Sequence, residues 1–301
     1  MKLIKPSFEI LEQLPGLEGM YKQIELAGRT CYKSEDKITE DSAKEFVDRM
    51  IKSGHGAMLE HGTVYLLIHD DDYTEQHVKE YMENSFTKVK DGNNGWLYIT
   101  TNLRVLVEND WLEDLQYICE PTEYHEKRHT VKFTCDRGVS HEFVRHRVFS
   151  FAQESTRYCN YSKDKFGNEI TCILPPWLSE NDLPKGFGYT SDDWGSLICE
   201  FYYEATEKGK SEGFIIEPVR NFVFALQTSE QLYFSLLKEG WKAQEARSVL
   251  PNALKTELVM TGFESDWKHF FDLRCPGSAH PQARELAIPL QEKFKELKWV
   301  D

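Results

Sequence analysis

The stretch Arg145-His146-Arg147-Val148-Phe149-Ser150-Phe151-Ala152-Gln153-Glu154-Ser155-Thr156-Arg157-Tyr158 concentrates three arginines and a histidine in a chain whose formal net charge is −14. An arginine guanidinium presents a rigid fork of donors that matches the oxygens of a phosphate or carboxylate two at a time. The stretch therefore predicts a pocket for a small anion, flanked by aromatic side chains that could face a planar ring. A surface turn closed by salt bridges is the alternative that composition alone leaves open.

The composition is that of an ordinary globular chain, with 301 residues of which 40% are hydrophobic and 29% charged. The acidic balance argues against binding a nucleic-acid backbone, which needs a broad basic face. No apolar run approaches the roughly 20 residues of a membrane span, and the first six residues lack the apolar core of a signal peptide. The seven cysteines include no Cys-x-x-Cys pair and favour reduced thiols over disulfides or a zinc site. We expect a soluble, cytoplasmic protein without nucleic-acid or membrane partners.

Hydrophobic spacing in the first half of the chain predicts helices and strands on either side of a charged middle segment. That segment, about 66–128, is rich in charges and turn signals, which favours an accessory hairpin and helix on the surface. The elements expected in this half are a helix over 8–28 leading into a bend at 27–34, a helix over 42–51, a strand over 63–68, a strand over 96–101 and a helix over 103–115.

In the second half, the helical pattern over 139–149 raises a question about Arg147. On a helical wheel, Arg147 falls within the apolar arc, whereas Glu142 and His146 fall opposite. An unpaired charge in an apolar arc is costly, so Arg147 needs an anionic or ring partner, or the helix ends before it. The other elements expected are a regular element over 130–135, helices over 196–209, 219–238, 265–273 and 281–297, and a strand over 256–261.

Histidines provide a different hypothesis. His55 and His61 lack the spacing of the His-Glu-x-x-His zinc helix, and such a pair is more often hydrogen-bonded structure than metal ligation. A metal-dependent hydrolase that uses His55, His61, His141 and His146 is nevertheless a rival reading. No metal site is predicted.

With these residues in view, the chain resembles the flavin-dependent thymidylate synthases. The family signature is Arg-His-Arg, seven residues and then Ser, which here reads Arg145-His146-Arg147 followed by Ser155. The blocks that also match occur in the family order and span nearly the whole chain: Ala27-Gly28-Arg29-Thr30-Cys31-Tyr32, Leu59-Glu60-His61, Arg157-Tyr158, Glu245-Ala246-Arg247-Ser248-Val249-Leu250-Pro251, and Thr261-Gly262 through His269-Phe270 to Leu273-Arg274.

The resemblance implies an α/β (α+β) fold with a curved sheet flanked by helices, as a single domain over 1–301 with an insertion at about 66–128. It implies reductive methylation of dUMP to dTMP, with methylenetetrahydrofolate as carbon donor and FADH₂, reduced by NADPH, as hydride source. It further implies a homotetramer with active sites between subunits.

The resemblance also implies the roles of individual residues. Arg274 faces the pyrimidine and is the expected catalytic residue. The residues expected to bind FAD are His61, Thr63, Arg145, His146, Arg147, Gln153 and His269. Those expected to bind dUMP are Glu142, Arg145, Gln153, Glu154, Ser155, Arg157, Arg247 and Arg274.

Several points leave alternatives open. Glu142 stands where many family members have glutamine, and a carboxylate near a phosphate is unfavourable unless an arginine intervenes. Ser155 resembles a nucleophile flanked by arginines, but no histidine is in evident reach as a base, so phosphate binding is favoured. Taken alone, His269 and Arg274 could be a helix surface whose charge complements the helix dipole. A nucleotide-binding regulator that has lost turnover is a second rival.

Overall fold

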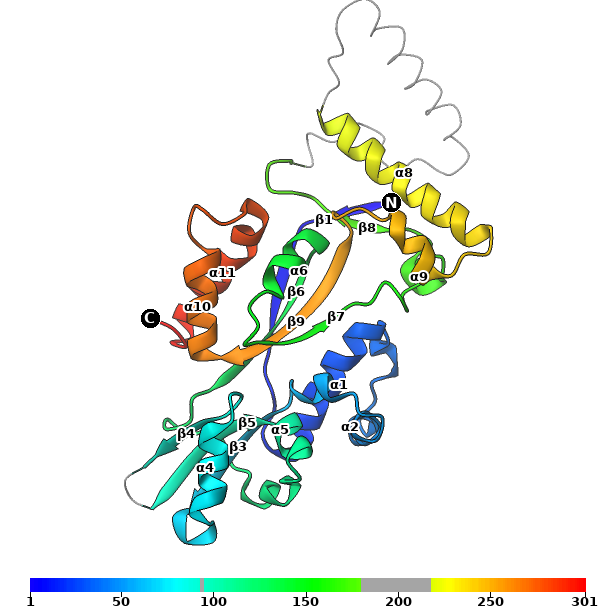
Figure 1. The fold of residues 1–301 in the computed structure, drawn as a ribbon. Helices are drawn as coiled ribbons and strands as arrows, with labels where there is room; N and C mark the ends of the chain where they lie inside the picture. The colour runs from blue at the N-terminus through cyan, green and yellow to red at the C-terminus, as the bar shows by residue number, and fades with distance from the viewer. Residues whose placement is uncertain (93–94, 180–217) are drawn as a thin grey trace, which may run out of the picture. The chain divides into compact units, whose positions relative to one another are not determined.

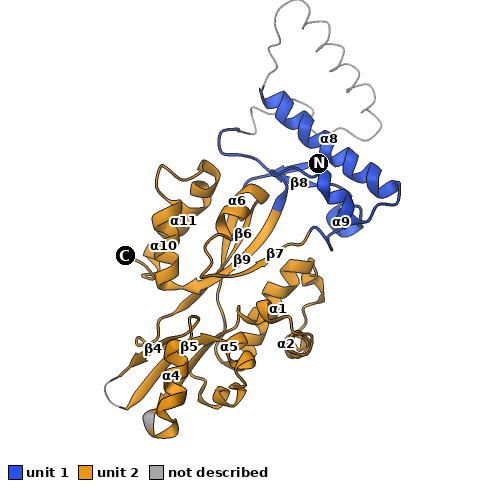
Figure 2. Ribbon diagram, in the orientation of Figure 1, with its two compact units in different colours: residues 1–5, 156–255 blue, residues 6–155, 256–301 orange. Residues whose placement is uncertain are grey.

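The computed structural model describes residues 1–92, 95–179 and 218–301 and combines helices with open β-sheets (Figure 1). The expected α/β (α+β) class is therefore confirmed. The chain divides into two compact units (Figure 2). Unit 1 comprises Met1–Lys5 and Thr156–Lys255, and unit 2 comprises Pro6–Ser155 and Thr256–Asp301. The expectation of a single domain stays a prediction.

A four-stranded sheet in the order β2-β6-β9-β7 forms the centre of unit 2. β6 pairs antiparallel with β2, which places Phe133 opposite Phe8, and β9 pairs antiparallel with β7, which places Thr261 opposite Ser150. Because side chains alternate between the faces of a strand, each strand contributes to both faces of the sheet. The strands are β2 (Ser7–Leu11), β6 (Arg128–Asp136), β7 (Ser150–Gln153) and β9 (Lys255–Phe263).

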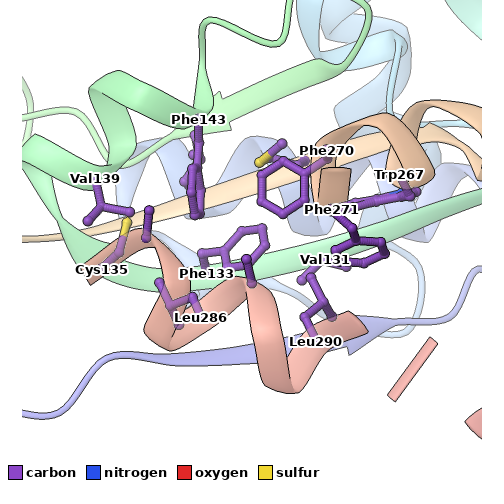
Figure 3. Packing of buried hydrophobic residues seen from close by; sticks show 14 of the residues in the cluster. Val131, Phe133, Cys135, Val139, Phe143, Trp267, Phe270, Phe271, Leu286 and Leu290 are labelled. Carbon is purple, nitrogen blue, oxygen red and sulfur yellow. The ribbon is translucent and has the colours of Figure 1, made fainter. Parts of the chain in front are cut away.

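Three helices pack on one face of this sheet and enclose an aromatic core (Figure 3). The Phe133 ring on β6 lies 5.1 Å from that of Phe143 and 6.3 Å from that of Phe270, centroid to centroid. Trp267 is fully buried, and its Nε1 donates a hydrogen bond to the His129 carbonyl. Burial of such large rings is strongly favourable. This core therefore holds the helix that carries Phe143 and the helix that carries Trp267 and Phe270 against the sheet. The helices are α6 (Arg137–Phe143), α10 (Glu264–Arg274) and α11 (Pro281–Glu296).

A second core in unit 2 joins the first helices to a three-stranded sheet of order β3-β5-β4. Leu66 of β3, Ile99 of β5, Leu106 of α5 and Ile24 of α1 are each at most 1% exposed. The hairpin β4–β5 and the helix expected within 66–128 are present. Their expected placement on the surface is wrong for Leu66, Ile99 and Leu106, because the side chains of these three residues are buried. The elements are α1 (Gly16–Tyr32), α2 (Ser42–Lys52), α3 (Gly56–Leu59), β3 (Thr63–His69), α4 (Glu75–Glu83), β4 (Lys88–Asp91), β5 (Trp96–Asn102) and α5 (Leu103–Glu108).

Unit 1 contains a parallel two-stranded sheet, β1 with β8, and the helices α8 and α9. Its core includes Tyr161 and Tyr233, whose ring centroids lie 5.8 Å apart. The elements are β1 (Lys2–Ile4), β8 (Thr171–Ile173), α8 (Pro218–Lys238) and α9 (Ala243–Ala246). α8 confirms the helix expected over 219–238, whereas the one expected over 196–209 lies outside the described residues. Of the helices that the structure describes, none has the length and apolar character of a membrane span.

Three expected elements differ from the structure. The helix expected over 8–28 is instead strand β2 followed by α1, which begins at Gly16. The bend expected at 27–34 is wrong, because α1 continues to Tyr32 and ends at Lys33, whose φ is 49°. The helix expected over 103–115 is α5 followed by the 3₁₀ helix Leu112–Tyr117, with Asp110 at a φ of 61° between them.

Candidate active site

The arginine-rich motif begins directly after a short helix of unit 2. The side chain of Asp136 caps α6 by accepting a hydrogen bond from the Val139 amide at 2.8 Å. The helix ends at Phe143, so the interpretation that it ends before Arg147 is confirmed. In the turn that follows, Arg145 and Arg147 are exposed, whereas His146 between them is 6% exposed.

Neither arginine of this turn is closed into a salt bridge. The side chains of Arg145 and Arg147 have no hydrogen bond or ion pair with any residue that the structure describes. The alternative of a salt-bridged surface turn is therefore wrong for these two residues. Two exposed guanidinium groups without partners are available to an anion.

A third arginine, Arg274, meets this turn from the end of α10. Its Nη1 donates to Oε2 of Glu142 at 2.6 Å, and its Nη2 donates to the backbone carbonyl of Glu142 at 2.7 Å. Its Nε donates to Nε2 of His146 at 3.0 Å. Arg274 thus lies in the last turn of its helix, but its guanidinium is held by residues more than 120 positions earlier in the sequence. The interpretation of Arg274 as helix surface that complements the dipole leaves out its three hydrogen bonds to Glu142 and His146.

The ring of His146 is uncharged in this arrangement. Burial, the neighbouring Arg274 charge and His269 lower the pKa of His146 from 6.5 to about 4. A neutral ring is also what the hydrogen bond requires, because a guanidinium has no acceptor and the imidazole nitrogen must accept. His269 is exposed on α10, with its ring centroid 6.2 Å from that of His146.

His61 and Thr63, both expected at the flavin, lie in a buried polar layer of unit 2. His61 is fully buried, with its Nδ1 2.8 Å from Oγ1 of Thr261. Oγ1 of Thr63, which is 4% exposed, accepts a hydrogen bond from Nη1 of Arg128 at 3.3 Å. Arg128 also donates to Oγ of Ser150, and burial lowers the pKa of Arg128 to about 10. The assignment of His61 and Thr63 to the flavin stays a prediction.

Arg128 and its neutral partners are the polar cluster that sequence reasoning missed. Its contacts come from residues 22 and 65 positions away, so no local pattern announces them. The available signal is the position of a charged residue at the start of a buried strand, where an unpaired charge requires partners.

The expected dUMP residues are divided between the two units. Gln153 in unit 2 donates through Nε2 to Oγ of Ser140 at 2.8 Å, and Glu154 is 2% exposed. The backbone amide of Ser155 donates to the Cys31 carbonyl at 2.9 Å, which ties the end of the motif to α1. Arg157 and Arg247 belong to unit 1, where Nη1 of Arg247 donates to Oγ1 of Thr156 at 3.1 Å.

The four histidines of the rival metal reading do not gather. His61 is enclosed beside Thr261, and His146 accepts from Arg274. Within residues 1–92, 95–179 and 218–301, no three His, Cys, Asp or Glu side chains are grouped as metal ligands. The geometry therefore gives the metal-dependent hydrolase no site among the described residues.

Acid is expected to destabilise the protein through its buried histidines. His61 has its pKa lowered to about 3, chiefly by burial, and His146 to about 4. Because the unfolded chain takes up these protons near pH 6.5, stability is full above that pH and falls as the pH drops toward 4. For His146, this lowering corresponds to roughly 3 kcal/mol. Thermal unfolding midpoints at pH 7 and 4.5 measure the loss, which should be smaller in His146→Gln. Equal losses in both proteins would contradict this origin.

Comparison with known proteins assigns the chain to a class. Residues 124–298 match the family described as "Thymidylate synthase complementing protein". The chain is 24% identical over 275 residues to the flavin-dependent thymidylate synthase of Corynebacterium aurimucosum, which covers 91% of this chain and 75% of that protein. It is 30% identical over 159 residues to that of Geobacter sulfurreducens, covering 53% and 52% of the two chains. The chain therefore belongs to the thymidylate synthase complementing protein family, as its sequence blocks predicted.

The solved structures similar to this chain include the UMP/dUMP methylase PolB from Streptomyces cacaoi bound with 5-Br dUMP. It shares 16% sequence identity with this chain and covers 99% of this chain and 93% of its own, with a TM-score of 0.42.

Proposed function

We propose that this chain catalyses the reductive methylation of dUMP. In the balanced reaction, dUMP, methylenetetrahydrofolate and FADH₂ give dTMP, tetrahydrofolate and FAD, and NADPH regenerates FADH₂. Family membership supports the reaction class, and the curated relatives named above are flavin-dependent thymidylate synthases. The observation that carries the proposal is the arrangement of Arg274, Glu142 and His146 beside two exposed, unpartnered arginines.

The residues present fit FAD in part. The free guanidinium groups of Arg145 and Arg147 suit its diphosphate, and the exposed ring of His269 can contact it. His61 and Thr63 fit less well, because both have little exposed surface and because Nδ1 of His61 and Oγ1 of Thr63 already have buried partners. Nε2 of His61 is the exception, since it is buried without a hydrogen-bond partner among the described residues. When bound and reduced, FAD supplies the hydride that converts the transferred methylene into a methyl group.

Arg274 carries the electrostatic part of this proposal. Bond formation at C5 of uracil requires electron density at that carbon, and negative charge on the ring can supply this density until C5 bonds to the methylene carbon. A guanidinium held in advance of the reaction stabilises this charge without reorganising during the step. Arg274 is held in this way by three hydrogen bonds.

The remaining assignments belong to the same proposal. Gln153, Glu154, Ser155, Arg157 and Arg247 bind dUMP, with Ser155 at the phosphate and not acting as a nucleophile. The enzyme is a cytoplasmic homotetramer whose active sites lie between subunits. These assignments rest on the match of the sequence blocks with the family.

The test of the proposal is conversion of dUMP into dTMP by the purified chain supplied with FAD, NADPH and methylenetetrahydrofolate. We expect dTMP to form only when all of these components are present. The rival regulator would bind dUMP without forming dTMP or oxidising NADPH.

A further inference from the structure

Arg274 donates hydrogen bonds to two residues, Glu142 and His146. Glu142 accepts twice, with Oε2 on Nη1 and its backbone carbonyl on Nη2, and Nε2 of His146 accepts from Nε. A guanidinium has five N–H donors, one on Nε and two on each terminal nitrogen. These contacts therefore occupy three donors and leave one free on each terminal nitrogen.

We propose that Glu142 and His146 are positioning residues that fix Arg274 in one orientation, with its two remaining N–H groups reserved for the nucleotide. This inference rests on the proposed function. It gives Glu142 a place in the site that does not require contact with the substrate phosphate. The ion pair with Arg274 offsets the charge of this carboxylate, which removes the objection to a carboxylate at position 142.

Glu142 is suited to this work because it is both rigid and charged. Its backbone carbonyl lies at the end of α6, and this helix is held by the core residues Val139 and Phe143. The carbonyl contact therefore places one guanidinium nitrogen relative to the sheet, and the carboxylate places the other. A charge-assisted bond of this kind is about twice as strong as a neutral one, which restricts the long arginine side chain to one rotamer.

His146 contributes an acceptor and therefore a defined tautomer. Because Nε2 accepts from Arg274, the single proton of the neutral ring is on Nδ1. The charged groups that face this ring are Arg274 and, through Arg274, Glu142, with His269 on the same helix as Arg274. The histidine of the arginine motif is thus coupled to Arg274 through Nε2, and its Nδ1–H remains free to donate.

Substitutions at position 142 test the inference in the full-length, FAD-loaded protein. Glu142→Ala keeps the backbone contact but removes the charged one, and we expect kcat to fall about ten-fold or more. The KM for dUMP should change much less, because orientation of Arg274 matters most as charge develops on the ring. Glu142→Gln keeps a neutral acceptor and should recover part of the loss. The control is Glu292→Gln on the exposed face of α11, which should leave kcat unchanged.

A second measurement is independent of turnover. Nitrogen-15 spectra of the imidazole of His146 should report a protonated Nδ1 and an unprotonated Nε2 above pH 6. A proton on Nε2, or a Glu142→Ala enzyme with the wild-type kcat, would overturn the inference. Failure of the proposed function looks different, because the wild-type chain would then form no dTMP while the His146 spectrum stayed as expected.

Discussion

Replacing Arg274 with alanine is expected to abolish most of the chemical step while leaving the nucleotide bound. Removal of one preorganised donor to a developing charge costs about 10²–10³ in kcat in other enzymes. If Arg274 acts mainly as charge appears on the uracil ring, kcat falls far more than the affinity for dUMP. Single-turnover oxidation of the pre-reduced enzyme measures the chemical step, and calorimetry measures dUMP binding. Equal losses in affinity and kcat would show a substrate-binding role instead.

Cys275 provides the matched control, because it directly follows Arg274 and a thiol near the ring suggests covalent catalysis. Burial is the main cause that raises the pKa of this thiol above its usual value, which disfavours the thiolate that would attack the ring. We therefore expect Cys275→Ala to keep substantial activity. An inactive Cys275→Ala enzyme with normal FAD and dUMP binding would replace the electrostatic mechanism with a covalent one.

Replacing Leu66 with alanine is expected to reduce the free energy of unfolding by about 2–5 kcal/mol. Leu66 is fully buried in the second core of unit 2, opposite Ile99 of β5, so the substitution leaves a cavity in that core. Urea denaturation measures the loss. The control is Met82→Ala in the same segment, whose side chain is 57% exposed and should cost little. Equal effects of the two substitutions would mean that this segment contributes no core to the protein.

The same pair of variants addresses the role of the segment 66–128 in the chemistry. None of the expected site residues lies within it, and many of its buried hydrophobic side chains, including Leu66, Ile99 and Leu106, belong to the second core. A stability loss in Leu66→Ala with kcat preserved below the unfolding temperature agrees with a segment that supports the fold and does no chemistry. Whether the segment is an insertion relative to shorter relatives stays a prediction.

Elements with a single strong local signal could be predicted from the sequence. The last helix begins at Pro281, where the missing amide hydrogen is tolerated, and continues with apolar residues at helical spacing. Strand β3 begins at Thr63, as the apolar run predicted, and alternates buried and half-buried side chains from Val64 onward. Helix α2 begins at Ser42 as expected.

Strand β2 was missed because two periodicities overlap there. Leu11, Leu14 and Leu17 follow one another at helical spacing, yet Leu14 is 60% exposed and Leu17 is 39% exposed. Phe8 and Ile10 follow the strand period instead and pack against the aromatic core. Tertiary burial decided between the two patterns, and no local signal contains that information.

The site was predictable in its residue types but not in its contacts. The arginine motif and Arg274 were identified from the sequence. The structure brings them together, with Nε of Arg274 3.0 Å from Nε2 of His146. The bond between Glu142 and Arg274 joins residues 132 positions apart, and it depends on the packing of α6 and α10 against one sheet. A charged pair formed by tertiary packing produces no characteristic spacing in the sequence, so sequence analysis does not find it.

The most direct test of the account is a single turnover in the absence of oxygen. The protein is loaded with FAD, reduced, and mixed with dUMP and methylenetetrahydrofolate labelled in its methylene carbon. The account predicts that the oxidised flavin spectrum returns only when both substrates are present, and that the label appears in dTMP. Flavin-loaded protein that binds dUMP but forms no labelled dTMP would contradict the account, as would protein that takes up no FAD.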